Sequence, residues 1–391
     1  LYSHGMTHTE PKNVVELLRT MVSIDSVNLA GSEGRREPKI IEYLAFVAAA
    51  FGFSVRRLPV ADAGENLLVI CDRGPNRPWI LFDSHVDTVA VENMTIDPFA
   101  GEIRDGKLWG RGACDTKGTG AAMLWALHEY AISGDHPNSI AILFSIDEEV
   151  AMRGIRSFVD NDYPTLGFGK PSIVVGEPTR LRLVTAHNGV CRARVRTRGV
   201  AAHASYPPAG RSAISSMAKI VNGLESGYIA GLERSDSLTG RAQCSINTIR
   251  GGTSTNIIPD LCEAEIDRRM VPGEDPDEVV AGLRAAIAAI QQGHPEIEYE
   301  MDVLFLSPPL APKPSSAIAS ALRRALAREG LLEEEVGVTY ATNAGDLSQR
   351  GVDTVVFGPG DIAQAHTKDE WVDIEELRRG VRVYRAVMAD G

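Results

Sequence analysis

The chain of 391 residues lacks most of the features that mark secreted, membrane-spanning or disulfide-rich proteins. Its five cysteines are odd in number, widely spaced and never arranged as Cys-x-x-Cys, which argues against a disulfide framework and a thiolate zinc site. No apolar run approaches the roughly 20 residues of a membrane span, and residues 1–11 include no secretory hydrophobic segment. We therefore expect a cytoplasmic protein without a membrane partner. Leu1 to Gly5, which precede Met6, are interpreted as foreign to the native chain.

Basic residues are also in the minority. The chain has 52 acidic and 40 basic residues and a formal net charge of −12, which argues against a nucleic-acid partner or an anionic membrane surface. It contains no internal repeat and no low-complexity tract. Its 44% hydrophobic and 24% charged residues are typical of an ordinary globular protein, and its length allows about two to three domains.

Short apolar runs alternate with helical patterns in the first part of the chain, which is typical of an α/β domain. We expect helices at Val14–Met21 and Lys39–Phe51, and strands at Asn66–Ile70, Trp79–Phe82, Ser139–Ile146 and Ser172–Val175. The last three strands end in polar residues. Because ligands bind at the carboxyl ends of parallel strands, these ends should meet in one crevice. Asp105-Gly106 predicts a hairpin turn that leads the chain towards Asp115.

From about Gly189 the pattern changes to that of a strand-rich α+β domain. Its strands are expected at Val190–Thr197, Gln243–Ile249, Leu261–Arg269 and Ile297–Phe305, and its helices at Arg211–Glu225 and Pro276–Gln291. The first domain then resumes, after a proline-rich linker, with helices at Ser315–Glu329 and Ile374–Met388 and strands at Val336–Tyr340 and Thr354–Phe357. The linker is Leu306–Pro314. We predict a catalytic domain, 6–188 plus 306–391, with a mostly parallel central sheet flanked by helices, interrupted by a smaller domain at 189–305.

Acidic and imidazole side chains gather at the predicted strand ends. Asp87 follows His85 by two residues and can accept its second ring N–H, which is how a metal-bound imidazole is usually oriented. A buried His–Asp hydrogen bond without a metal is an equally good interpretation of this pair. Asp115 lies in the glycine-rich loop Trp109–Gly118, where its two oxygens can each bind a cation. Capping of the helix that begins near Thr116 is the alternative.

The run Asp147-Glu148-Glu149 follows a strongly apolar strand. Glu148 and Glu149 should point in opposite directions, so that one can bind a metal while the other faces the substrate. Glu177 ends another strand, and His366 lies in a loop. Taken singly, these are more often solvated acids, turn residues and a loop histidine. Together they form a sulfur-free donor set that suits zinc, cobalt or manganese and permits two ions with one shared carboxylate.

Five motifs in the chain resemble those of a known enzyme family. They are SHVDT, GRGACDTKG, IDEE, VVGEPT and GPGDIAQAHTKDEWV. In this order they resemble the motifs of the two-zinc hydrolase family that contains acetylornithine deacetylase, succinyl-diaminopimelate desuccinylase, aminoacylase-1 and the glutamate-releasing bacterial carboxypeptidases, among them carboxypeptidase G.

The resemblance implies two Zn²⁺ per subunit, with Co²⁺ or Mn²⁺ as substitutes. One ion would be bound by His85, Asp115 and Glu177, and the other by Asp115, Glu149 and His366. Glu148 would act as general base on a bridging hydroxide, and Asp87 would orient His85. The family also usually has a cis peptide after the bridging acid, here Asp115-Thr116.

The second domain carries part of the resemblance. His203 in GVAAHAS corresponds to a histidine that reaches the partner's active site in a homodimer and donates to the developing oxyanion. Asn256 in NIIP and Arg269 in DRR correspond to residues that bind the substrate's carboxylate. Without the family, these three would be a surface histidine, a turn former and a solvated strand residue. Arg268 is one position off the pattern and is assigned no role, and Cys114 is interpreted as packing.

The segments GEPT and AHNG look closest to the acetylornithine deacetylase branch, so the expected reaction is removal of the acyl group from an N-acyl amino acid. Asn188 departs from the lysine common in that branch, and Asn343 to Asp346 match no one substrate. A dipeptidase or carboxypeptidase of the same family, or the desuccinylase, is the alternative. Two further hypotheses are disfavoured. An inactive relative that serves only as a binding protein would have lost metal-binding residues, and all of them are present here. A protein with a purely structural metal site would have no use for Glu148.

Overall fold

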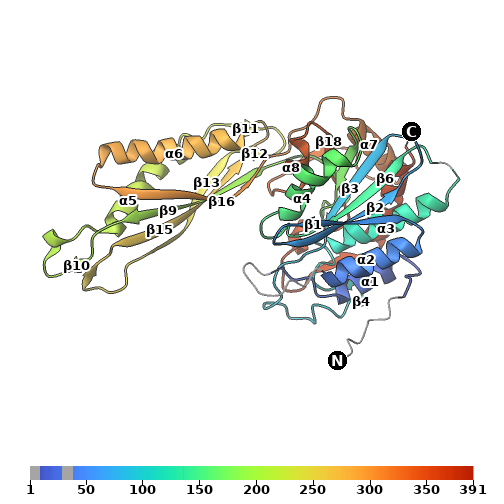
Figure 1. Cartoon of the computed structure of the whole chain (residues 1–391), viewed down its shortest axis with the longest axis horizontal. Helices are drawn as coiled ribbons and strands as arrows, with labels where there is room; N and C mark the ends of the chain where they lie inside the picture. Colours follow the sequence, from blue (N-terminus) through green and yellow to red (C-terminus); the bar gives the residue numbers. More distant parts are fainter. Residues whose placement is uncertain (1–8, 29–37, 135, 391) are drawn as a thin grey trace. The chain divides into compact units, whose positions relative to one another are not determined.

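The computed structural model describes residues 9–28, 38–134 and 136–390, so the interpretation of Leu1 to Gly5 lies outside the described residues. The chain divides into two compact units (Figure 1). The first comprises the chain up to Thr185 together with Lys313–Val336 and Thr342–Gly391, and the second comprises Ala186–Pro312 and Gly337–Ala341. The short segment Gly337–Ala341 was expected in the first domain but groups with the second unit.

An eight-stranded sheet forms the centre of the first unit, which confirms the α/β class. Its order is β1-β2-β6-β3-β7-β18-β8-β17. The four neighbouring strands β6, β3, β7 and β18 are parallel, whereas β1 pairs antiparallel with β2, β2 with β6 and β8 with β18, so the sheet is mixed. The strands are β1 Ser54–Val60, β2 Gly64–Cys71, β3 Trp79–His85, β6 Ser139–Ser145, β7 Ser172–Val175, β8 Leu183–His187, β17 Glu335–Val338 and β18 Asp353–Val356.

Helices cover this sheet because the parallel strands are apolar on both faces; every residue of β6 is buried. The central helix α3 packs on β3 and β6 and against α1 and α9, while α7 packs on β7 and β18. The helices are α1 Val14–Ser23, α2 Pro38–Ala50, α3 Lys117–Ile132, α4 Arg153–Ser157, α7 Ala317–Arg328, α8 Ala344–Ser348 and α9 Ile374–Met388, with short helical turns η1 Phe158–Asp162, η2 Tyr163–Thr165 and η5 Ile362–Gln364.

A small three-stranded sheet precedes the Asp115 loop. It consists of β4 Glu102–Arg104, β5 Lys107–Trp109 and β19 Trp371–Asp373. Asp105 and Gly106 connect β4 to β5 with φ values of 51° and 73°, the left-handed conformations that a two-residue hairpin turn requires. The predicted hairpin is therefore confirmed.

The second unit is an antiparallel sheet with two helices on one face (Figure 1). Ala193 and Val195 face the helices, while Arg194 and Arg196 point away and pair with acids of the next strand. The elements are β9 Gly189–Arg198, β13 Gln243–Gly251, β15 Leu261–Met270, β16 Glu298–Ser307, α5 Ala213–Gly223 and α6 Pro276–Gly293, with the short β10 Ala202–His203, β11 Ser235–Asp236, β12 Gly240–Arg241, β14 Ile257–Ile258, η3 Pro207–Ala209 and η4 Leu224–Ile229.

Two local expectations were wrong. Strand β6 ends at Ser145, so Glu148 and Glu149 lie in a turn and do not owe their directions to strand alternation. Asp147 begins this turn with a left-handed φ of 63°. Leu306–Pro314 is not a free linker, because β16 continues to Ser307 and Leu310 forms a β-bridge with His187. Within the described residues, no helix is long and apolar enough to cross a membrane.

Candidate metal centre

Four parallel strands deliver polar side chains to one end of the central sheet. His85 is the last residue of β3, and Glu177 follows β7 by two residues. The turn after β6 carries Glu148 and Glu149, and the loop after β18 carries His366. The convergence expected from the strand ends is therefore present in the structure.

These residues form two groups that share Asp115. His85, Asp115 and Glu177 each offer a donor atom within 4.8 Å of the others, and the same holds for Asp115, Glu149 and His366. Both sets contain only carboxylate oxygens and imidazole nitrogens. This donor chemistry fits zinc, cobalt or manganese, so these five residues form a candidate site for two metal ions.

The two oxygens of Asp115 face different histidines. Its Oδ1 lies 3.0 Å from Nε2 of His85, and its Oδ2 lies 3.3 Å from Nε2 of His366. The carboxylate does not cap α3, because the N-cap position belongs to Thr116 and carries no side-chain cap bond. The Asp115-Thr116 peptide bond is cis. Asp115 thus has the placement expected of a carboxylate that bridges two cations.

The ring of His85 is oriented by the chain after β3. Its Nδ1 donates to the backbone carbonyl of Asp87 at 3.0 Å, whereas the Asp87 carboxylate lies 3.5 Å away. The backbone oxygen of Asp87 is therefore the nearer acceptor, and the acceptor that the sequence predicts, the Asp87 carboxylate, lies slightly further from the ring. Because Nδ1 donates to this carbonyl, Nε2 is the ring nitrogen that a metal ion can take over from the hydrogen bond to Asp115.

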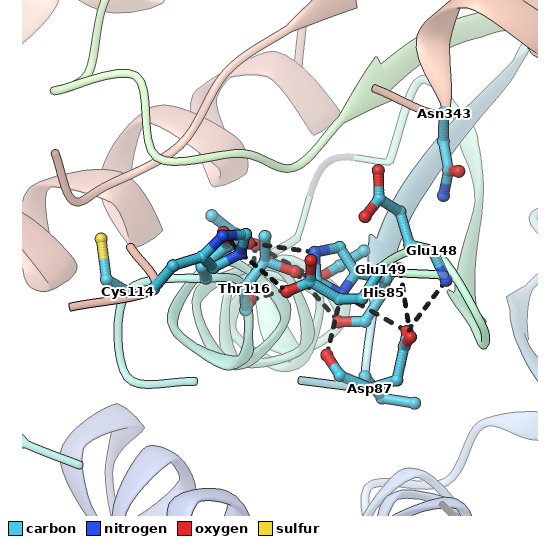
Figure 2. Close-up of polar contacts among 12 residues, drawn as sticks. His85, Asp87, Cys114, Thr116, Glu148, Glu149 and Asn343 are labelled. Atoms are coloured by element: carbon cyan, nitrogen blue, oxygen red, sulfur yellow. Dashed lines mark hydrogen bonds and ion pairs between the residues drawn. The ribbon is translucent and has the colours of Figure 1, made fainter. Parts of the chain in front are cut away.

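The Asp87 carboxylate instead supports the neighbouring turn. Its Oδ1 accepts the backbone N–H of Glu148 at 3.1 Å, and its Oδ2 accepts that of Glu149 at 3.2 Å (Figure 2). Figure 2 shows the side chains of Glu148 and Glu149 leaving this turn in different directions. One turn thus supplies a proposed metal ligand, Glu149, and an acid that belongs to neither ligand set, Glu148.

The carboxylates of the cluster repel one another. Burial, together with the nearby charge of Asp115, raises the pKa of Glu149 and raises that of Glu177 well above its ordinary value. Burial likewise raises the pKa of Glu148, against the opposing charge of His85. Among the described residues, no lysine or arginine forms an ion pair with these three glutamates. Such a cluster needs positive charge, which two divalent cations would supply.

The histidines respond in the opposite sense. Hydrogen bonds to Asp115 and Glu149 raise the pKa of His366 to about 10. Burial opposes protonation of His85, but its hydrogen bonds to Asp115 and Asp87 raise its pKa well above the ordinary value. A metal ion competes for the same ring nitrogen as the proton, so the metal-free cluster holds protons where a cation can bind.

Glu370 is a buried residue of the site that sequence reasoning missed. Its Oε1 accepts the backbone N–H groups of Cys114 at 2.9 Å and Asp115 at 3.0 Å, and its Oε2 pairs with Arg111 at 2.7 Å. The residue lies within the GPGDIAQAHTKDEWV motif, but only the fold shows which backbone groups it meets. Glu370 therefore fixes the loop that presents Asp115.

Cys114 has no features of a nucleophile. Its side chain is buried and donates to the carbonyl of Asp361 at 3.3 Å. Burial and the charge of Glu370 raise the pKa of this thiol well above its ordinary value. A neutral, enclosed thiol packs against its surroundings and does not attack a substrate.

The other three predicted site residues lie in the second unit. His203 is exposed in β10, and its Nδ1 accepts the backbone N–H of Ser205 at 3.1 Å. Asn256 precedes β14, which pairs with β10, and its Oδ1 accepts the hydroxyl of Ser254. Arg269 in β15 pairs with Asp267 at 2.6 Å. The structure thus brings His203 in β10 close to Asn256, which lies just before β14, and places Arg269 in the main sheet of this unit.

Arg268 points to the other face of β15. Its side chain is buried and pairs with Glu274 at 2.5 Å. This buried ion pair joins the strand to the loop before α6. Arg268 therefore has a structural contact, in agreement with the sequence analysis, which assigns it no role in the site.

Comparison with known proteins identifies the family. Residues 81–390 match the model of peptidase family M20/M25/M40. The chain is 30% identical to acetylornithine deacetylase of Myxococcus xanthus over 373 residues, which cover 93% of each protein.

Solved structures share the fold. An M20 family metallo-carboxypeptidase from Sulfolobus solfataricus matches 97% of this chain and 99% of its own, with a TM-score of 0.82 and 16% identity. A dinuclear metal-binding peptidase of the M20 family from Bacillus subtilis matches 96% of each chain, with a TM-score of 0.69 and 17% identity. The chain therefore belongs to peptidase family M20/M25/M40 and is a metallohydrolase.

Proposed function

We propose that this metallohydrolase removes the acyl group from an N-acyl amino acid, with N-acetylornithine as the first substrate to test. The observation that carries the proposal is the placement of Asp115, whose two oxygens face His85 and His366 at 3.0 and 3.3 Å. A relative 30% identical over nearly the whole chain is named acetylornithine deacetylase, which supports this choice of substrate.

The proposed ligands follow from the two groups around Asp115. His85, Asp115 and Glu177 would bind one Zn²⁺, and Asp115, Glu149 and His366 the other, with Co²⁺ or Mn²⁺ as possible substitutes. Two such ions would lower the pKa of a bound water from about 15.7 towards 7 and polarise the amide carbonyl.

Glu148 has the placement of a general base. Its backbone is fixed by the Asp87 carboxylate, and its side chain belongs to neither group of ligands. The glutamate takes a proton from the attacking water and later gives it to the departing amine nitrogen.

His203 would donate to the developing oxyanion of a partner subunit in a homodimer. Its Nδ1 already accepts a hydrogen bond from Ser205, so in the neutral ring the proton lies on Nε2, which can donate. Asn256 and Arg269 would bind the substrate's carboxylate. Asp267 occupies the Nε edge of Arg269, which leaves the outer edge of its guanidinium for a ligand.

A peptidase is the second candidate. The solved relatives named above are described as a carboxypeptidase and a peptidase, and the same cluster suits any linear amide. A dipeptide and an N-acetyl amino acid differ in the group on the acyl side of the scissile bond. Succinyl-diaminopimelate desuccinylase activity is tested by the same measurements.

The test is a substrate panel on protein of known metal content. N-acetylornithine, other N-acetyl and N-succinyl amino acids, and dipeptides are each assayed with zinc, cobalt and manganese. We expect turnover of N-acetyl amino acids that is lost with a chelator and restored by metal. Cleavage of dipeptides alone would replace the deacetylase proposal by the peptidase one, and no metal-dependent amide cleavage would refute both.

The compartment is proposed to be the cytoplasm. All five cysteines are free, and none of them forms a disulfide. Free cysteines, most of them buried, are typical of proteins kept in a reducing environment.

A further inference from the structure

One asparagine connects the two segments that support the catalytic turn. The Nδ2 group of Asn28 donates to Oδ2 of Asp87 at 3.0 Å and to Oδ1 of Asp147 at 2.9 Å. Asp87 follows β3, and Asp147 begins the turn after β6. Both carboxylates are fully buried. Asn28 is therefore a link between the chain that orients His85 and the chain that carries Glu148.

The backbone around Asn28 is fixed in this place. Val27 forms a parallel β-bridge with Thr88, and the N–H of Asn28 donates to the carbonyl of Thr88 at 2.8 Å. The hydroxyl of the buried Ser26 donates to the carbonyl of Val86 at 2.7 Å. This segment thus runs beside residues 86–88, which holds the side chain of Asn28 next to Asp87.

The chemistry of an amide group suits this position. An asparagine NH₂ has two hydrogens, so it can donate one to each carboxylate and separate two like charges. A hydroxyl has one hydrogen, and an aspartate would add a third negative charge. Arg153 binds the other side of Asp147 at 2.6 Å, so Asp147 is held from both sides. Asp87 in turn accepts the N–H groups of Glu148 and Glu149.

We propose that Asn28 is a positioning residue for Glu148: it fixes Asp87 and Asp147 relative to each other and thereby sets the turn that aims the general base. Only the kinetic test of this inference rests on the proposed function, because it requires a substrate that the protein cleaves. The side chain of Asn28 contacts Asp87 and Asp147, and neither of these is a proposed metal ligand. Removing this side chain should therefore disturb the turn and leave both ions bound.

The test compares Asn28→Ala with Asn138→Ala. Asn138, which is buried, likewise donates twice from one amide, to the carbonyls of Met388 at 2.9 Å and Asp390 at 2.7 Å. It precedes β6 at the end opposite the turn. We expect Asn28→Ala to lower kcat about ten- to hundredfold at full metal content with little change in KM. Asn138→Ala should lower the melting temperature and leave kcat unchanged.

A second variant and a second measurement complete the test. Asn28→Ser keeps one donor and should show an intermediate loss of kcat, which also serves if the alanine variant does not fold. Amide hydrogen exchange of the peptide that covers Glu148 and Glu149 should become faster in both Asn28 variants and stay unchanged in Asn138→Ala.

Three results in the Asn28 variants would overturn the inference. They are unchanged hydrogen exchange in this peptide, unchanged kcat, and a loss of bound metal that accounts for the lower kcat. In addition, Asn28→Ala should cause no further loss in a Glu148→Ala background, because the residue acts through Glu148; additive losses would contradict it. If the wild-type protein cleaves no amide, the proposed function fails, whereas the exchange measurement still decides the role of Asn28.

Discussion

A single aspartate carries the proposed two-metal site. Because each oxygen of Asp115 faces its own histidine, one residue can complete both groups of ligands. Its loop is held by Glu370, whose carboxylate accepts two backbone N–H groups and pairs with the buried Arg111. The position of the bridging residue is thus set by partners that do not themselves belong to the ligand sets.

Glu148 should separate catalysis from metal binding. We predict that Glu148→Ala retains both metal ions and lowers kcat about 10²- to 10⁴-fold, the range that general-base catalysis contributes. Metal content is measured by elemental analysis and kcat on the best substrate of the panel. An empty site in this variant would contradict the role of Glu148, because it would make the residue a ligand.

At the scale of single residues, the sequence predicts the residues that are themselves proposed to bind metal, but not the residues that position them. His85 ends an apolar strand, and Glu149 and Glu177 follow two others, so their proximity follows from the parallel sheet. Asn28 and Glu370 act through partners 59 to 259 positions away in sequence, and no local pattern marks them. The backbone carbonyl of Asp87 lies nearer to the ring of His85 than the Asp87 carboxylate does, because the chain leaves strand geometry after His85.

The turn between β6 and α4 is the element on which the general base depends. The N–H of Gly154 in α4 donates to the carbonyl of Ile146 at 3.1 Å, and Asn66 binds both Gly154 and Ile146. A Cβ atom at Gly154 would lie 2.2 Å from the oxygen of Ile146. Helix α4 can therefore dock on the end of β6 only with glycine at this position.

Gly154→Ala should shift this turn. We predict a loss of about 1–3 kcal/mol in the free energy of unfolding, because backbone atoms must move apart, together with a fall in kcat. Gly106→Ala is the matched control: a Cβ there meets nothing within 4 Å, and only its φ of 73° is unfavourable. The control should lose about 1 kcal/mol and keep its kcat. Unchanged kcat in Gly154→Ala would show that the turn tolerates displacement.

Elements with a strong apolar pattern were predictable, and those at the sheet margins were not. The strands β3, β6 and β7 and the helix α9 agree with the expected segments within a few residues. Strand β1 was missed because Ser54–Val60 contains two arginines and a proline, as an edge strand tolerates. Strand β8 was missed although all its residues are buried, because it lies close to the change from one unit to the other.

For the whole molecule, the buried carboxylates link stability to metal and pH. The raised pKa values of Glu148, Glu149 and Glu177 mean that the metal-free folded state binds more protons than the unfolded state. The stability of the metal-free protein should therefore fall as pH rises above the ordinary glutamate pKa of 4.5. Bound cations offset this repulsion, so a chelator should lower the melting temperature more at pH 8 than at pH 6. An equal decrease at both pH values would contradict a charged cluster.

The proposed homodimer leads to a separate prediction. His203→Ala should lower kcat strongly while leaving the dimer intact, because the histidine is exposed and holds no core. Mixed dimers of a His203→Ala subunit and a Glu148→Ala subunit should regain activity, since one active site then has both an intact base and an intact partner histidine. Mixed dimers without activity would place His203 outside the partner's site, and the mass in solution checks that the dimer forms.

Asp115 is proposed to bridge two cations. The most direct test of this proposal is a crystal structure of the zinc-loaded protein with anomalous diffraction recorded at the zinc edge. We predict two anomalous peaks in each subunit, one among His85, Asp115 and Glu177 and one among Asp115, Glu149 and His366. A single peak, or two peaks that do not share Asp115, would contradict it.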